Sequence, residues 1–238
     1  MAEGVTTTST ARSAAPVGWL RPSAVLFDLD GTISDSGASI TTSIAETLAH
    51  FGYPVPSGEE LLSFVGPPIA EGFQRLGGVE SHHLAEVVAD YRRRYRTRLA
   101  EAPIFAGMAE LITDLHRERL PLAIATSKRQ SMAEDVLRAY GLIDYFTIVC
   151  GAAEDESRGA KVDIIADALA GLRRAHCDVS RAVMVGDRYH DIQGARAHGI
   201  EAILVAWGYG APSEADGAVA VATTVDELRA MLLPTPRR

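Results

Sequence analysis

Two aspartates close the first apolar run of the chain. In the stretch AVLFDLDGTISDS, residues 24–36, Asp28 and Asp30 stand two positions apart, with Gly31 behind them. Because successive side chains of a strand point to opposite faces, both carboxylates are predicted to lie on the same side. Paired carboxylates at one place suit nucleophilic attack, acid–base chemistry or the binding of a hard cation.

Further polar side chains stand at the ends of later apolar runs or beside a helix start. They are Thr126, Ser127, Lys128, Lys161, Asp187 and Asp191. Several carboxylates in a partly buried site repel one another unless a cation holds them, and oxygen-only side chains suit Mg²⁺. The lysines add the positive charge that a phosphate requires. The pattern therefore predicts metal-assisted phosphoryl transfer.

Five short apolar runs are predicted to be the strands that position these groups. They cover residues 24–28, 121–126, 146–150, 182–186 and 202–206. Hydrophobicity that is continuous rather than alternating is typical of parallel strands buried on both faces. Ligands of such open sheets gather at the carboxyl ends of the strands, where the candidate residues stand.

Helical patterns cover residues 108–120, 131–141, 161–174 and 191–199. In the second of these, Ser131 and Glu134 form a candidate capping box and Gly141 a stop, while Gly199 ends the fourth. Alternating strands and helices predict an α/β fold, a three-layer α/β/α sandwich around a mainly parallel sheet.

About ninety residues separate the first two predicted strands, far more than one crossover needs. Their pattern is helical: one helix ends at Gly52, a capping box from Ser57 to Glu60 opens another, and residues 82–100 form a longer one. We predict a flexible tail at residues 1–21, an α/β core at 22–35 and 102–234, and an inserted helical cap at 36–101.

The composition is that of an ordinary globular protein, with 47% hydrophobic and 23% charged residues. The formal net charge of −8 gives no footprint for nucleic acid or an anionic membrane. There is no signal-peptide core and no apolar stretch of membrane-spanning length. These features predict a cytoplasmic protein without nucleic-acid or membrane partners.

Four segments, in this order, resemble the four motifs of the haloacid dehalogenase superfamily: DLDGTISDS, AIATSK, the isolated Lys161 and VGDRYHDIQGA. The match spans about residues 24 to 210 and implies a Rossmann-like core with a C1-type helical cap. Within the superfamily, FVGPPI, SRGAK and VGDRYHD look most like the phosphoglycolate-phosphatase and 5′-nucleotidase-like branch. Many relatives have a proline after the motif lysine, where this chain has Val162.

The resemblance implies roles for the candidate residues. Asp28 would be the nucleophile that forms an aspartyl-phosphate, and Asp30 would protonate the leaving alcohol and then activate water. Mg²⁺ would be held by Asp28, the Asp30 backbone carbonyl and Asp187. Asp191 would act through a bound water or by orienting Lys161, and could also cap its helix. The phosphate would be bound by Gly31, Thr126, Ser127 and Lys161, with Lys128 as a competitor for it.

Other conspicuous residues receive plainer interpretations. The arginines between residues 92 and 98 are predicted to form a solvated helix face opposite an apolar stripe. Tyr209 is interpreted as loop packing, and His190 as a local structural group. The segment FVGPPI is predicted to be a rigid turn at the place where capped relatives contact their substrate.

The expected function is that of a Mg²⁺-dependent phosphatase acting on a small phosphorylated metabolite, as a monomer or homodimer. Asp30 disfavours a dehalogenase, because halide displacement needs no such acid. A mutase or kinase would share every core motif, and VGPP, SRG and WGYG look close to an actinobacterial protein described as a tyrosine kinase. No kinase-type glycine-rich loop is present. A non-catalytic scaffold is the remaining alternative, although it would not need costly clustered carboxylates.

Overall fold

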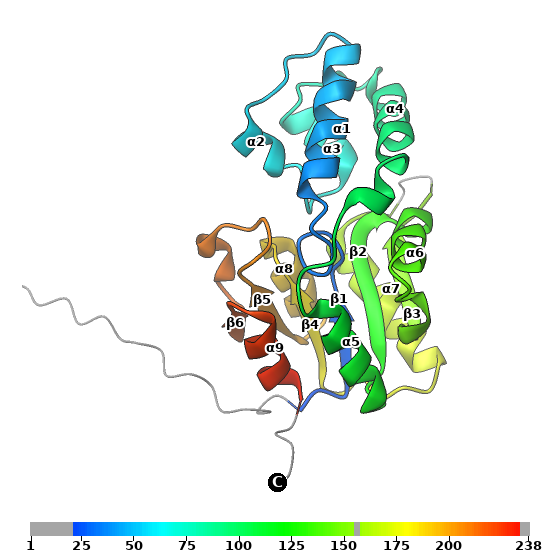
Figure 1. Ribbon diagram of the computed structural model, residues 1–238, viewed down its shortest axis with the longest axis vertical. Coiled ribbons are helices and arrows are strands. Elements are labelled where there is room, and N and C mark those ends of the chain that lie inside the picture. The colour runs from blue at the N-terminus through cyan, green and yellow to red at the C-terminus, as the bar shows by residue number, and fades with distance from the viewer. Residues whose placement is uncertain (1–20, 155–157, 234–238) are drawn as a thin grey trace, which may run out of the picture.

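The computed structural model describes residues 21–154 and 158–233. Its centre is a six-stranded sheet in the order β3-β2-β1-β4-β5-β6, in which all neighbouring strands are parallel (Figure 1). The strands are β1 (Ala24–Phe27), β2 (Leu122–Arg129), β3 (Ile148–Ala152), β4 (Ala182–Gly186), β5 (Glu201–Val205) and β6 (Ala220–Ala222). The predicted parallel sheet is confirmed.

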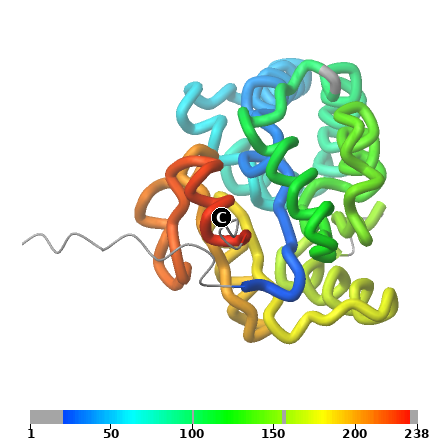
Figure 2. The backbone as a smooth tube through the Cα atoms, turned by 60° about the horizontal axis from the view of Figure 1, so that its bottom comes forward, coloured from blue at the N-terminus to red at the C-terminus, as the bar shows by residue number. Residues whose placement is uncertain are grey.

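Helices cover both faces of this sheet. One face packs against α5 (Met108–Arg117), α6 (Gln130–Ala139) and α9 (Val225–Leu232), and the other against α7 (Lys161–Arg174) and α8 (Tyr189–Ala197). Alternate residues of β1 divide between the two cores: Val25 belongs to one and Leu26 to the other. Figure 2 shows α5 and α7 on opposite sides of β1. The three-layer architecture is therefore as predicted.

Some predicted details differ in the structure. The strand β2 continues past Thr126 to Arg129, with an irregular register against β3. The short edge strand β6 was not predicted, because three residues carry too little pattern. The capping box at Ser131 was wrong: α6 begins one residue earlier, and the Ser131 amide donates to Glu154 at 3.3 Å instead.

Of the five α-helices between β1 and β2, α5 packs on the sheet and the first four stand beyond the carboxyl ends of the strands (Figure 1). They are α1 (Gly37–His50), α2 (Gly58–Leu62), α3 (Ile69–Arg75) and α4 (Leu84–Arg96), here called the inserted helices. The capping box from Ser57 to Glu60 is present at the start of α2. Gly52 has a φ of +75°, in keeping with its predicted place after α1.

The two connections between the inserted helices and the sheet lie side by side. Ser34 and Ile104 form an antiparallel bridge. The Tyr140 hydroxyl donates to the Ala102 carbonyl at 2.8 Å and lies 2.7 Å from Ser34 Oγ. A tyrosine of the core thus contacts both connections at once.

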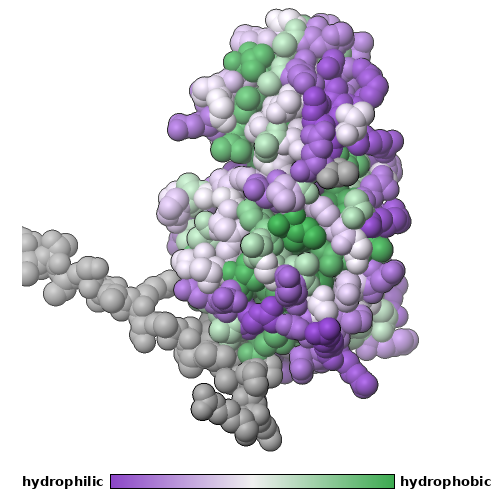
Figure 3. All heavy atoms as spheres, viewed as in Figure 1, coloured by the Kyte–Doolittle hydropathy of each residue, from purple (hydrophilic) through white to green (hydrophobic). Residues whose placement is uncertain are grey.

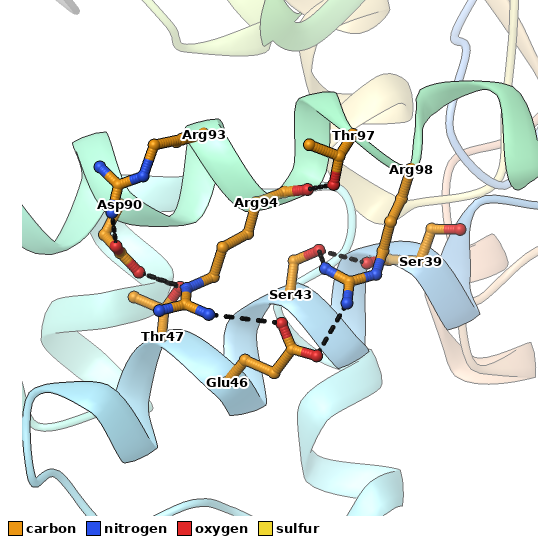
Figure 4. A network of polar contacts seen from close by, with 9 residues as sticks. All are labelled: Ser39, Ser43, Glu46, Thr47, Asp90, Arg93, Arg94, Thr97 and Arg98. Atoms are coloured by element: carbon orange, nitrogen blue, oxygen red, sulfur yellow. Dashed lines mark hydrogen bonds and ion pairs between the residues drawn. The ribbon is translucent and has the colours of Figure 1, made fainter.

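The arginine-rich helix α4 is not simply a solvated face, which corrects the prediction. Arg94 and Arg98 both reach Glu46 on α1, at 3.6 and 2.8 Å (Figure 4). Arg93 and Arg94 also bind the buried carboxylate of Asp90. Exposed hydrophilic side chains do gather over this part of the molecule in Figure 3. The physical reason for the difference is that α1 places the Glu46 carboxylate opposite these arginines, which the pattern of one helix alone does not reveal.

The predicted tail at residues 1–21 falls almost entirely on residues 1–20, which lie outside the described residues. Among the described helices, none is long and apolar enough to span a membrane. Three short 3₁₀ helices, Leu99–Glu101, Ile143–Tyr145 and Pro212–Ala215, complete the described structure.

Candidate active site

Asp28 follows the last residue of β1 and is buried, with 2% of its surface exposed. Its amide donates to the Val185 carbonyl of β4 at 2.9 Å, which fixes it at the carboxyl edge of the sheet. Lys161, the first residue of α7, brings its ammonium to 2.8 Å from Asp28 Oδ1. The same ammonium lies 2.8 Å from Asp191 Oδ1 and donates to the Ala125 carbonyl at 3.0 Å. The ammonium is therefore surrounded by three oxygen atoms, two of them from carboxylates.

Asp30 lies in the same pocket as Asp28 but has different partners. Ser36 Oγ donates to Asp30 Oδ1 at 2.6 Å, and Lys128 Nζ lies 2.9 Å from Asp30 Oδ2. Lys128 also donates to the Tyr95 hydroxyl of α4 at 2.8 Å. The two lysines thus pair with different aspartates: Lys161 with Asp28 and Asp191, and Lys128 with Asp30.

Asp187 stands at the carboxyl end of β4 and is completely buried. Gly31, Gly208 and Gly210 pack directly against it. Its Oδ2 accepts a 2.7 Å hydrogen bond from the Tyr209 amide. A Cβ at Gly31 would overlap this carboxylate, and Gly31 also has a φ of +82°. Glycine is needed at position 31 both for its backbone conformation and for the close approach of Asp187.

Asp191 has two contacts at once, as the sequence allowed. Its Oδ2 accepts the Arg188 amide at 3.1 Å and caps the start of α8, while its Oδ1 faces Lys161. The helix cap holds the carboxylate still. Orienting Lys161 is one of the two roles that the family resemblance implied for Asp191.

The carboxylates of this cluster are held in an unfavourable electrostatic state. Burial raises the pKa of Asp28 to about 6, assisted by Asp191 and opposed by Lys161. Burial and the charges of Asp28 and Asp191 also raise the pKa of Asp187 well above its usual range. A bound cation would relieve this repulsion.

The residues present fit a hard divalent cation. Asp28, Asp187 and Asp191 each offer one carboxylate oxygen, and these oxygens lie within 4.8 Å of one another. Asp28 Oδ1, Asp187 Oδ1 and Asp191 Oδ1 are buried and accept no hydrogen bond from the described part of the chain, and of the three only Asp187 Oδ1 also has no ammonium at ion-pair distance there. A set of carboxylate oxygens with one acceptor left over is suited to Mg²⁺.

A cavity of about 260 Å³ opens above the cluster, between the sheet and the inserted helices. Asp28, Asp30, Thr126 and Ser127 line it from the core side. The Thr126 hydroxyl is buried and accepts the Lys128 amide at 3.2 Å. Residues 64–70 of the inserted helices line the opposite side, so the FVGPPI segment faces the cavity.

Arg188 joins the core to that segment. Its guanidinium donates to the Val65 carbonyl and lies 3.1 Å from Glu214 Oε2. Gly66 has a φ of +108°, and a Cβ there would lie 2.8 Å from Arg188 Cγ. The turn that faces the cavity is therefore held by a residue that follows Asp187 directly in the chain.

The comparisons with known proteins agree with this geometry. A family model described as haloacid dehalogenase-like hydrolase matches residues 25–205. The chain belongs to this family.

Relatives of several named activities share the fold. The chain is 43% identical over 216 residues to the tyrosine-protein kinase PtkA of Mycobacterium tuberculosis, covering 89% of this chain and 72% of that protein. It is 35% identical to a 5′-nucleotidase of Pseudomonas aeruginosa, covering 82% and 87% of the two chains. A crystal structure of a predicted phosphatase from Clostridium acetobutylicum matches with a TM-score of 0.81 and 30% identity, covering 87% and 96%.

Within this member of the haloacid dehalogenase-like hydrolase family, the structure brings together every site residue that the sequence singled out, Gly31 and Ser127 included. Sequence reasoning missed three partners. Tyr209 holds Asp187 and the start of α1, Tyr95 binds Lys128, and Arg92 of α4 lines the cavity. The alternation of Tyr91 and Tyr95 with arginines was the available signal for α4, but it fits a buried stripe equally well.

Proposed function

We propose that the protein is a Mg²⁺-dependent phosphatase that hydrolyses a small organic phosphate monoester through a phosphorylated Asp28. The observation that carries this proposal is the pairing of Asp28 with Lys161 at 2.8 Å, with Asp30 lining the same cavity. Phosphatase-named relatives and neighbours support the same reaction class. In this proposal the inserted helices act as a cap over the reacting phosphate.

Asp28 would attack phosphorus with a carboxylate oxygen, while the bond from phosphorus to the ester oxygen breaks. Asp30 would give its proton to the departing alkoxide, and would then take a proton from the water that hydrolyses the acyl phosphate. Lys161 orients the Asp28 carboxylate and adds positive charge near the phosphate oxygens. The Thr126 hydroxyl, Ser127 and the backbone at Gly31 would bind those oxygens.

The cation would be held by Asp28, Asp187 and the Asp30 carbonyl, with Asp191 close by. When bound, Mg²⁺ neutralises charge on the phosphate and on the clustered carboxylates. The chain itself keeps the site dry, since Asp28, Asp187 and Asp191 are all buried. It also fixes Asp30 through Ser36 and Lys128.

Phosphoryl transfer to an acceptor is a second candidate function, favoured by the 43% identity to a protein named tyrosine-protein kinase. The first half of the reaction would be the same, because Asp28 would again take the phosphoryl group. The acceptor would then replace water as the attacking group. The two functions differ in whether inorganic phosphate is the product.

The test is phosphate release from a panel of small phosphate esters, with Mg²⁺ or with EDTA. Asp28→Asn and Asp30→Asn should each abolish turnover, whereas Asp178→Asn, on the exposed surface, should not. Transfer of labelled phosphate to the protein, absent in Asp28→Asn, would identify the covalent step. Folded wild type that releases phosphate from no ester but labels a tyrosine substrate from ATP would favour the second function.

A further inference from the structure

A second cavity, of about 520 Å³, lies beside the first and is lined mainly by arginines. Arg92, Arg93 and Arg96 come from α4, and Arg129 comes from the end of β2. The side chains therefore approach from both the inserted helices and the core. We call this space the arginine cavity.

The arginine cavity continues the one above Asp28. Arg92, Arg129 and Met132 line both spaces, so they stand at the boundary between them. A molecule whose phosphate lies on Asp28 can thus extend past Arg92 toward Arg96. Together the two spaces have the size of ordinary small-molecule sites.

The charge in this cavity is unusual for a chain with a formal net charge of −8. Partial burial, with the nearby positive charge of Arg129, lowers the pKa of Arg92 to about 10. Among the described residues, two carboxylates pair with these arginines: Asp90 of α4 binds Arg93, and Glu154, which follows β3, lies 3.1 Å from Arg129. Asp90 is shared with Arg94.

Arg96 differs from the other arginines of the cavity in its ion pairing. In residues 21–154 and 158–233 no carboxylate lies within ion-pair distance of its guanidinium, although it lines the cavity. A guanidinium presents a planar fork of donors that matches a phosphate or carboxylate. Clustered guanidiniums repel one another, and a bound anion would remove that cost.

We propose that the arginine cavity binds a second anionic group of the substrate. The substrate class is then a phosphate monoester that carries a further phosphate or carboxylate, with the reacting phosphate on Asp28 and the other anion between Arg92, Arg96 and Arg129. This inference rests on the proposed phosphatase function.

The proposal is tested by comparing kcat/KM within two pairs of phosphate esters, whose members differ in whether they carry a second anionic group. One pair is 3-phosphoglycerate and glycerol 3-phosphate, and the other is fructose 1,6-bisphosphate and fructose 6-phosphate. Wild type should favour the doubly anionic member of at least one pair by about tenfold or more, the value of one or two charged hydrogen bonds. Arg96→Gln and Arg92→Gln should each reduce that ratio several-fold. Arg75→Gln, an exposed arginine of α3 outside both cavities, should leave it unchanged.

Binding separates failure of this inference from failure of the proposed function. In Asp28→Asn protein with Mg²⁺, calorimetry should show fructose 1,6-bisphosphate binding more tightly than fructose 6-phosphate, and Arg96→Gln should remove the difference. If wild type hydrolyses both members of each pair equally, the inference is wrong and the phosphatase stands. If no ester is hydrolysed, the phosphatase proposal fails, and equal binding of the two fructose esters would then overturn the arginine cavity as well.

Discussion

The Tyr209 hydroxyl accepts a hydrogen bond of 2.6 Å from the Gly37 amide. It also donates to the Asp35 carboxylate at 2.8 Å, and the Tyr209 amide binds Asp187. Gly37 begins α1, so one residue of the core ties a carboxylate of the site to the start of the inserted helices. The position of those helices is thereby coupled to the position of Asp187.

Tyr209→Phe should weaken this coupling while keeping the ring in place. We expect a loss of about 1 kcal/mol in the free energy of unfolding, and an increase of about three- to tenfold in KM with a smaller change in kcat. Steady-state kinetics and urea unfolding measure the two effects. Tyr145→Phe, at a half-buried tyrosine of a 3₁₀ helix away from the cavities, is the control. An unchanged KM in Tyr209→Phe would contradict the coupling.

Gly66→Ala and Gly52→Ala form a matched pair. Both glycines have a positive φ, but a Cβ at Gly66 meets Arg188 whereas one at Gly52 has open space. Each substitution should therefore cost about 1 kcal/mol of stability from backbone strain. Only Gly66→Ala should also lower kcat/KM, because the turn that faces the cavity must shift. Equal activity of the two variants would show that contact between Arg188 and the turn is unimportant for turnover.

The stability of the metal-free protein should fall as the pH rises from about 4 to about 6. The pKa of Asp28 is raised from 3.8 to about 6 in the folded state, chiefly by burial, so the folded state binds the proton more tightly in this window. Asp28→Asn should remove this contribution and be more stable than wild type at pH 7, in EDTA, by a few kcal/mol. Urea unfolding across the range measures the difference, and added Mg²⁺ should raise wild-type stability at pH 7. A difference between the two proteins that stays constant with pH would refute this prediction.

Asp90 should contribute to stability with the opposite dependence on pH. Burial alone would raise the pKa of Asp90, but Arg94 and Arg93 outweigh it and lower the pKa below the ordinary value of 3.8. Its contribution is therefore complete above that value and is lost as the pH falls through the lower folded pKa. Asp90→Asn should cost about 2 kcal/mol at pH 7 and much less near pH 2, by urea unfolding. Asp163→Asn, a half-exposed carboxylate 3.9 Å from Arg158, should show little change at either pH.

The sheet could be predicted because its signals are local. Continuous apolar runs such as the one that ends at Asp28 fix the strands, and parallel order follows from the helices between them. The strand β6 and the true start of α6 could not be predicted, because they depend on neighbours. The Ser131 amide is bonded by Glu154, which is distant in sequence.

The aspartates and Lys161 could be predicted because they occupy strand ends and helix starts, which the topology brings to one edge. Their partners could not. Lys128 faces Asp30 rather than the Asp28 centre, and Tyr209 reaches back over 172 positions to Gly37. The role of Arg92 is equally invisible in the sequence, because it depends on how α4 lies over β2. Such contacts depend on how distant elements pack together, and a single sequence does not reveal that packing.

The bridge between Ser34 and Ile104 makes the insertion a loop that is closed at its base. The backbone links the sheet to this loop only at the two adjacent ends of the loop. The entropy of closing a loop grows slowly with its length, by about 0.6 kcal/mol for each doubling. The insertion can therefore become longer or shorter at little entropic cost, without rebuilding the sheet edge that holds Asp28, Asp30 and Asp187.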